Sequence, residues 1–201
     1  MKILALELSS ARGSVAWRDD NSEWAREWPN DRKNSGEFFR NLVEAQDQFG
    51  PPGRIVVGLG PGSYAGTRIA ISAAIGLQLA VKAELIGLPS LCAIECGAPE
   101  YAVLGDARRQ SFFVARVRDR IMSAAPVLQS EAELRSSLVA LSARMPVFAV
   151  EKLPQFDGVP VRYPSAEILA RLAAEENRAF VLPRLEPMYL REPHITTPKD
   201  K

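Results

Sequence analysis

The sequence has few of the residues that build metal centres. It contains one histidine, His194, and two cysteines, Cys92 and Cys96, in 201 residues. A zinc site takes four ligands, mostly Cys and His, so these three side chains do not complete one. A Ser-His or Cys-His catalytic pair is also excluded, because His194 lies in a polar tail. We therefore expect no metal and no hydrolytic site, and two largely buried thiols one helical turn apart.

Long apolar runs and an excess of charge of either sign are also missing. The longest apolar stretch, from Ile69 to Val81, is interrupted by polar residues and is too short to span a bilayer. The N-terminus reaches Glu7 after only four apolar residues, unlike a signal peptide. With 25 Lys and Arg against 24 Asp and Glu, no global field attracts nucleic acid or an anionic membrane. We expect a cytoplasmic protein without membrane contact.

The apolar residues that are present, 47% of the chain, follow a repeated order of elements. The first half reads as three strands, a helix, a strand and a helix. Its first helix has a capping pattern at Asn34-Ser35-Gly36-Glu37. The expected strands are Ile3–Glu7, Gly13–Arg18, Trp24–Trp28 and Arg54–Leu59, and the expected helices are Ser35–Phe49 and Thr67–Lys82.

The same order recurs about 100 residues later. A capping box at Ser130-Glu131-Ala132-Glu133 opens its first helix, and Asp106 falls where Glu7 falls in the first half. The expected strands are Tyr101–Asp106, Ser111–Arg118, Pro126–Gln129 and Val147–Val150, and the expected helices are Ser130–Ala143 and Ser165–Asn177.

The repeat predicts an α/β protein with two subdomains, each a mixed sheet with flanking helices, and a cleft between them. The join falls within Pro89–Pro99, so we expect subdomains at residues 1–98 and 99–201. Roughly the last 15 residues would return to the first subdomain or be mobile.

The most informative segment is the glycine-rich loop from Gly58 to Arg68. Glycines allow a ligand to approach the backbone closely, and a helix beginning just after them offers free amides to a phosphate. It is not a Walker loop, because no Lys-Ser or Lys-Thr pair ends it. Gly60–Ala65 matches the loose dinucleotide pattern, but Glu84 opens its strand instead of closing it. Alternatively, the glycines only permit a tight turn and close helix packing.

The helix after this loop is apolar almost all round, so we expect it to be buried on two sides. Its small residues Ala70, Ala73, Ala74 and Gly76 would let a partner helix come close. The alternative is a central core helix that is covered by its own chain.

Four segments together resemble the TsaB (YeaZ) family: the loop Gly60–Arg68, Gly87–Leu91, Asp106–Arg108 and Glu186–Arg191. The resemblance implies the duplicated actin/Hsp70/sugar-kinase (ribonuclease H-like) fold. It also implies a non-catalytic subunit for forming N6-threonylcarbamoyladenosine at position 37 of tRNAs that read ANN codons. The expected partners are the TsaD (Kae1-like) transferase and the TsaE ATPase. A homodimer would form without TsaD, and tRNA would be met only through the complex.

The resemblance also implies site residues. A TsaD-like transferase holds its metal with a His-x-x-x-His pair, which a chain with one histidine does not supply, so we expect no catalytic residue. The family pairs through the two helices of the first half, which predicts an interface at Phe39, Leu42, Ile69, Ala70, Ala73, Ala74 and Leu77. Weak nucleotide binding would involve Gly60, Gly62, Ser63, Gly66, Glu7 and Asp106.

The chain departs from the family at two places that bear on nucleotide binding. Glu7 replaces the usual Asp, and Val150-Glu151-Lys152 replaces a glycine-rich turn. We therefore expect no intrinsic cofactor, with ATP or ADP bound only at the complex interface. The rival function is an ATP-dependent small-molecule kinase with Glu7 or Asp106 as its base. Asp106 and Arg108 would either form a local ion pair or touch a ligand.

Overall fold

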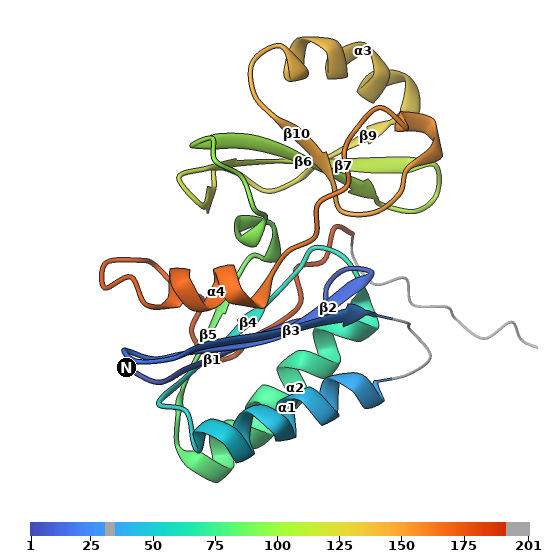
Figure 1. Cartoon of the computed structure of the whole chain (residues 1–201). Coiled ribbons are helices and arrows are strands. Elements are labelled where there is room, and N and C mark those ends of the chain that lie inside the picture. The colour runs from blue at the N-terminus through green and yellow to red at the C-terminus, as the bar shows by residue number, and fades with distance from the viewer. Residues whose placement is uncertain (31–34, 192–201) are drawn as a thin grey trace, which may run out of the picture.

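The computed structural model describes residues 1–30 and 35–191. Its first sheet has the strand order β3-β2-β1-β4-β5 (Figure 1). The central strand β1 is an apolar run buried along its whole length, as a strand covered on both faces should be. It pairs antiparallel with β2 and parallel with β4. The strands are β1 (Ile3–Glu7), β2 (Arg12–Arg18), β3 (Glu23–Pro29), β4 (Arg54–Gly58) and β5 (Glu84–Leu88).

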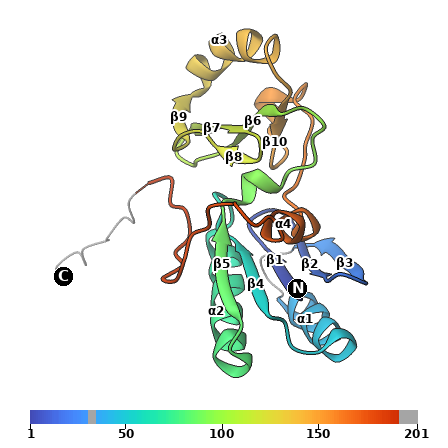
Figure 2. The same ribbon diagram turned by 90° about the vertical axis from the view of Figure 1, so that its left-hand side faces the viewer.

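Helices cover both faces of this sheet. The parallel pairs β1–β4 and β4–β5 require crossovers, which α1 (Gly36–Phe49) and α2 (Tyr64–Val81) provide on one face. The opposite face carries α4 (Ala166–Ala173), which lies between the first sheet and the second half of the molecule (Figure 2). The buried residues of α4 join a core that includes Ile3 and Val56 from the sheet.

The second half is built on a sheet with the order β10-β6-β7-β8, in which β9 also pairs with β7. As predicted, α3 begins with a capping box: the Ser130 hydroxyl accepts a bond from the Glu133 amide, and the Glu133 carboxylate accepts one from the Ser130 amide. The elements are η1 (Ser90–Ala93), β6 (Glu100–Asp106), β7 (Ser111–Arg118), β8 (Ile121–Met122), β9 (Val127–Ser130), α3 (Glu131–Ser142), β10 (Val147–Ala149) and η2 (Pro154–Phe156).

The predicted repeat is confirmed. In each half an antiparallel hairpin, β1–β2 or β6–β7, is extended by a third antiparallel strand. A helix then leads to a strand that runs parallel to the first strand of that half. Glu7 and Asp106 end the first strands of the two halves, as the sequence indicated. The architecture is the mixed α/β fold with two mixed sheets and flanking helices that was expected.

Several local predictions were wrong. Helix α2 begins at Tyr64, one turn early, because the Ser63 hydroxyl accepts a bond from the amide of Gly66. The cap predicted at Asn34 lies outside the described residues and stays a prediction, and Ser35, which precedes α1, makes no side-chain cap bond. The cysteines are not one helical turn apart, because η1 ends at Ala93 and the next residue is extended.

The C-terminal part of the chain returns to the first half. Helix α4, although it follows the second sheet in sequence, packs against β1, β2 and β4. Val181 then forms a bridge with Gly87 on β5, and the amide of Met188 donates to the carbonyl of Leu59. The predicted division at residue 98 stays a prediction, but residues well beyond it complete the packing of the first sheet.

Helix α2 has the composition of a membrane span, which is weak support for one because core helices share it. In this structure 28% of its residues are buried, and they face the sheet. The idea that α2 is a core helix covered by its own chain is therefore wrong. Its outer face carries exposed apolar side chains, including Ile75 and Leu79.

Candidate functional site

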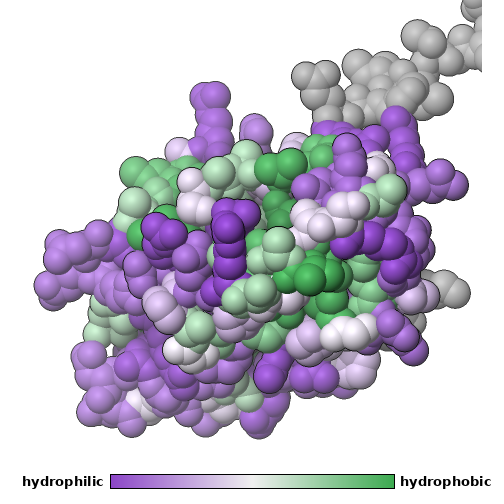
Figure 3. Space-filling view, turned by 90° about the horizontal axis from the view of Figure 1, so that it is seen from above, coloured by the Kyte–Doolittle hydropathy of each residue, from purple (hydrophilic) through white to green (hydrophobic). Residues whose placement is uncertain are grey.

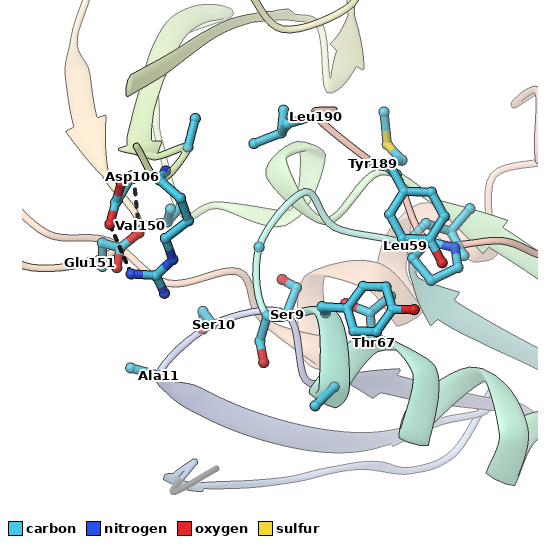
Figure 4. Close-up of a pocket in the computed structure, with 18 of the residues that line it drawn as sticks. Ser9, Ser10, Ala11, Leu59, Thr67, Asp106, Val150, Glu151, Tyr189 and Leu190 are labelled. Atoms are coloured by element: carbon cyan, nitrogen blue, oxygen red, sulfur yellow. Dashed lines mark hydrogen bonds and ion pairs between the residues drawn. The ribbon is translucent and has the colours of Figure 1, made fainter. Parts of the chain in front are cut away.

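A cleft of about 770 Å3 lies between the two halves. Hydroxyl groups line it on the side of the first half, and charged groups line it on the side of the second. Figure 4 shows Asp106 and Glu151 on one side and Thr67 and Tyr189 on the other. The polar lining residues on which the site depends are Ser9, Ser10, Ser63, Thr67, Asp106, Arg108, Arg109, Glu151 and Arg191.

The glycines of the loop allow the loop to pack against the end of β1. Gly62 has a φ of 156°, and a Cβ there would overlap the carbonyl oxygen of Ser9. A Cβ at Gly66 would overlap the carbonyl oxygen of Leu8 in the same way. Gly60 has a φ of 88°, which a side chain would strain. These glycines therefore permit a tight turn and close packing, which was the structural alternative that the sequence left open.

Three amides of this loop already have partners. The amide of Ser63 donates to the Ser9 carbonyl at 2.5 Å, and that of Gly66 donates to the Ser63 hydroxyl. The amide of Gly60 donates to the hydroxyl of Ser90 at 2.9 Å. A phosphate cradle needs free amides, so these three are not available to a phosphate.

Glu7 does not reach the cleft. It is completely buried, and its Oε1 accepts a bond from the Ser9 amide at 2.6 Å. Gly58 makes room for the longer side chain, because a Cβ at that position would overlap Glu7 Oε2. Burial raises the pKa of Glu7, and hydrogen bonds from Ser9 and Ser90 oppose this shift. The placement of Glu7 at the cleft surface, as a ligand-binding acid or a base, was therefore wrong.

Of the other residues predicted for nucleotide binding, Gly62, Ser63 and Asp106 line the cleft, whereas Gly60 and Gly66 do not. Whether any of them binds a nucleotide stays a prediction.

Asp106 forms the local ion pair that was one of its two interpretations. Its Oδ2 lies 2.9 Å from Arg108 Nη1, and its Oδ1 accepts a bond from the Arg108 amide at 2.6 Å. Glu151, which stands where the family places a glycine-rich turn, accepts a bond from the Asp106 amide at 3.0 Å. Charged side chains thus occupy the position that corresponds to the glycine loop of the first half.

No cluster of three or more His, Cys, Asp or Glu suited to a metal ion occurs within residues 1–30 and 35–191. His194 lies outside these ranges, and the absence of a metal stays a prediction. Cys92 is buried, which raises the pKa of its thiol to about 11 and makes it a poor nucleophile, whereas Cys96 is half-buried.

A second candidate site is formed by exposed apolar side chains on α1 and α2, both on the same face of the first sheet (Figure 1). Phe39 and Val43 lie four residues apart on α1, and Ile75 and Leu79 lie four apart on α2. We call these four side chains the α1–α2 surface. Figure 3 looks onto the second half from above, and there hydrophobic areas are broken up by hydrophilic residues.

The predicted interface overlaps this surface only in part. Phe39 is exposed, and Ile69, Ala73 and Leu77 are half-buried. The prediction that Leu42, Ala70 and Ala74 contact a partner was wrong, because these three face the sheet and belong to the core. The prediction also missed Val43 and Leu79. A helical wheel could have found them only once the sheet-facing positions were known.

Comparison with known proteins places the chain in a family. The family model described as TsaD, tRNA N6-adenosine threonylcarbamoyltransferase, matches residues 40–145, which is more than half of the chain. The chain belongs to this family. Uncharacterized proteins of Mycobacterium bovis and Mycobacterium tuberculosis are 31% identical over 143 residues. These alignments cover 69% of this chain and 64% of the relatives, which is less than two thirds of their length.

Two solved structures from Pseudomonas aeruginosa share the fold over nearly their whole length. YeaZ superposes with a TM-score of 0.71 at 22% identity, covering 94% of this chain and 99% of that one. A protein described as similar to peptidase YeaZ gives a TM-score of 0.75 at 23% identity, with the same coverage. Together with the family model, these matches confirm the predicted resemblance to the TsaB (YeaZ) family.

Proposed function

We propose that this chain is a non-catalytic subunit required to form N6-threonylcarbamoyladenosine at position 37 of ANN-decoding tRNAs. It would dimerise with the TsaD transferase and activate it. The observation that carries this proposal is the exposed α1–α2 surface in a member of the TsaD family.

The residue content supports the non-catalytic part of the proposal. The resemblance implies that a TsaD-like transferase binds its metal with two histidines, and this chain has one. The two carboxylates that the sequence offered as a base are engaged: Glu7 is buried, and Asp106 is paired with Arg108. This disfavours the kinase alternative, which needs one of these two acids as its base. Measurable ATP turnover by the isolated chain with a metabolite panel would restore it.

The α1–α2 surface supplies contact energy without any catalytic group. Leu79 is 76% exposed, and burying such a side chain contributes about 1–2 kcal/mol. Phe39, Val43 and Ile75 would add to this in the same interface. Small residues near them on α2, such as Gly76 and Ala80, are exposed and leave room for a partner helix.

The same proposal covers the further partners. TsaE would join the dimer, ATP or ADP would bind at the complex interface, and the protein would act in the cytoplasm. Without TsaD, the α1–α2 surface would pair two copies of this chain.

The test is a charge placed on the α1–α2 surface. Leu79→Glu should fold normally, because the side chain is exposed, but should bury an unpaired carboxylate in the complex. We expect it to lower TsaD affinity at least tenfold, measured by calorimetry. In cells depleted of this protein, it should fail to restore threonylcarbamoyladenosine in total tRNA, whereas wild type should restore it.

Val139→Glu is the matched control, because Val139 is a 78% exposed apolar residue on α3. It should bind TsaD and restore the nucleoside as wild type does. Unchanged TsaD binding by Leu79→Glu would refute the interface. Persistence of the modification after depletion would refute the function.

A further inference from the structure

An exposed aromatic pair stands at the mouth of the cleft and is not used by the proposed function. Tyr64 comes from the first turn of α2 and Tyr189 from the C-terminal segment. Their ring centroids are 5.6 Å apart, and the residues are 53% and 46% exposed. The two rings are inclined by 39° and are held against each other by segments far apart in sequence, so each leaves part of its aromatic surface open to the solvent.

One arginine contacts this pair, and two others line the same cleft. The Arg68 guanidinium lies 5.0 Å from the Tyr64 ring centroid and donates to its hydroxyl at 2.6 Å. Arg191, two residues after Tyr189, donates to the Ser111 hydroxyl at 2.6 Å and so links the C-terminal segment to the second half. The Arg109 guanidinium is exposed and makes no hydrogen bond or ion pair with the residues the structure describes.

The charge at the mouth remains positive. Three arginines, Arg108, Arg109 and Arg191, line the cleft against two carboxylates, Asp106 and Glu151. Asp106 is neutralised by Arg108. With Glu151 set against Arg109 and Arg191, one net positive charge is left to face an incoming anion.

We propose that the mouth of this cleft binds an unpaired nucleotide of single-stranded RNA. Its base stacks on the Tyr64–Tyr189 pair, and Arg109 and Arg191 contact backbone phosphates. Unpaired RNA bases are recognised by stacking on aromatic rings and by arginine. The inference rests on the proposed function, which brings tRNA to this chain, and adds a direct contact that the sequence did not predict.

Two observations favour RNA over a free nucleotide. Three loop amides that could bind a di- or triphosphate, those of Gly60, Ser63 and Gly66, are already engaged by Ser90, Ser9 and Ser63. The cationic groups sit on separate segments, Arg109 between β6 and β7 and Arg191 in the C-terminal segment. Separate charges suit phosphates that are spread along a strand.

The experiment measures binding of the full chain to a fluorescein-labelled RNA hairpin with an unpaired loop, by anisotropy at low salt. Tyr189→Ala should weaken binding by about 5- to 150-fold, the range found when a stacked base loses its aromatic partner. Tyr189→Phe keeps the ring and should bind as wild type does. Arg109→Ala should reduce the slope of log affinity against log salt by about 0.7. Arg144→Ala, which removes an exposed arginine of the second half, should leave the slope unchanged.

Three results would overturn the inference: equal affinity of wild type and Tyr189→Ala, equal binding of a fully paired RNA, or binding of ATP but not of RNA. The proposed function is tested separately, because Tyr189→Ala should bind TsaD with unchanged affinity. Loss of RNA binding by Tyr189→Ala with normal TsaD binding supports the proposed RNA site. If the wild-type chain binds TsaD but no RNA, the proposed RNA site is refuted and the proposed function still stands.

Discussion

The buried carboxyl of Glu7 should make the stability of this protein depend on pH in a direction unusual for an acid. Its burial raises its pKa above the ordinary value of 4.5, and the bond from the Ser9 amide does not fully offset this. In the unfolded chain Glu7 loses its proton near the ordinary value, whereas in the folded chain it keeps it to higher pH. The folded state thus binds more protons in this window, so stability falls as pH rises through it.

The change that isolates this effect is Glu7→Gln, which has nearly the same shape and does not ionise. Above pH 4.5, and up to the raised pKa, the free energy of unfolding of wild type should fall relative to Glu7→Gln by about 1.4 kcal/mol for each pH unit. Urea unfolding at several pH values between 4.5 and 8 measures the difference. Any pH-independent cost of burying the substituted amide changes the free energy of unfolding equally at every pH, so the slope of this free energy against pH stays unchanged.

Glu176→Gln provides the control, because Glu176 is exposed and the substitution removes the same charge. Its difference from wild type should stay flat over this pH range. A difference between wild type and Glu7→Gln that does not change from pH 4.5 to 8 would show that burial does not perturb Glu7.

Two further substitutions test the loop and the caps by thermal or urea unfolding. Gly66→Ala should destabilise the fold by about 3 kcal/mol, because its Cβ would overlap the Leu8 carbonyl. Gly76→Ala, with no atom near the added Cβ, should stabilise α2 by about 1 kcal/mol. Equal effects of the two substitutions on stability would contradict the close packing at Gly66. Ser130→Ala should cost about 1 kcal/mol by removing the capping box of α3, and a neutral result would show that this cap is not needed.

The sequence predicted what depends on neighbouring residues. The start of α3 followed from Ser130 and Glu133, because a capping box is a contact between residues three apart. The order of strands and helices followed from apolar patterns within each segment. The start of α2 was predicted a turn late, because glycines at positions 60, 62 and 66 indicated a loop, while the Ser63 cap tolerates Gly66 inside the helix.

What the sequence did not predict depends on contacts between distant residues. Whether Glu7 is buried depends on Gly58, which leaves space for its carboxylate. The packing of α4 against β1 joins residues more than 150 positions apart, and no local pattern encodes that. The exposed face of α2 was likewise hidden, because a helix that is apolar all round does not reveal which side the sheet covers.

The two candidate sites differ in a way that bears on how this chain acts. At the cleft, three amides of the glycine loop donate to Ser9, Ser63 and Ser90, and the acid that ends β1 is buried in the core. At α1 and α2, apolar side chains remain uncovered although the same helices bury their other faces well. Because Glu7 is buried, the cleft lacks the acid that the kinase alternative needs at the end of β1, whereas an uncovered apolar face is stabilised only by a partner. Both features favour a subunit that works by contact, and they explain why Leu79→Glu should impair the function more than any substitution at Glu7.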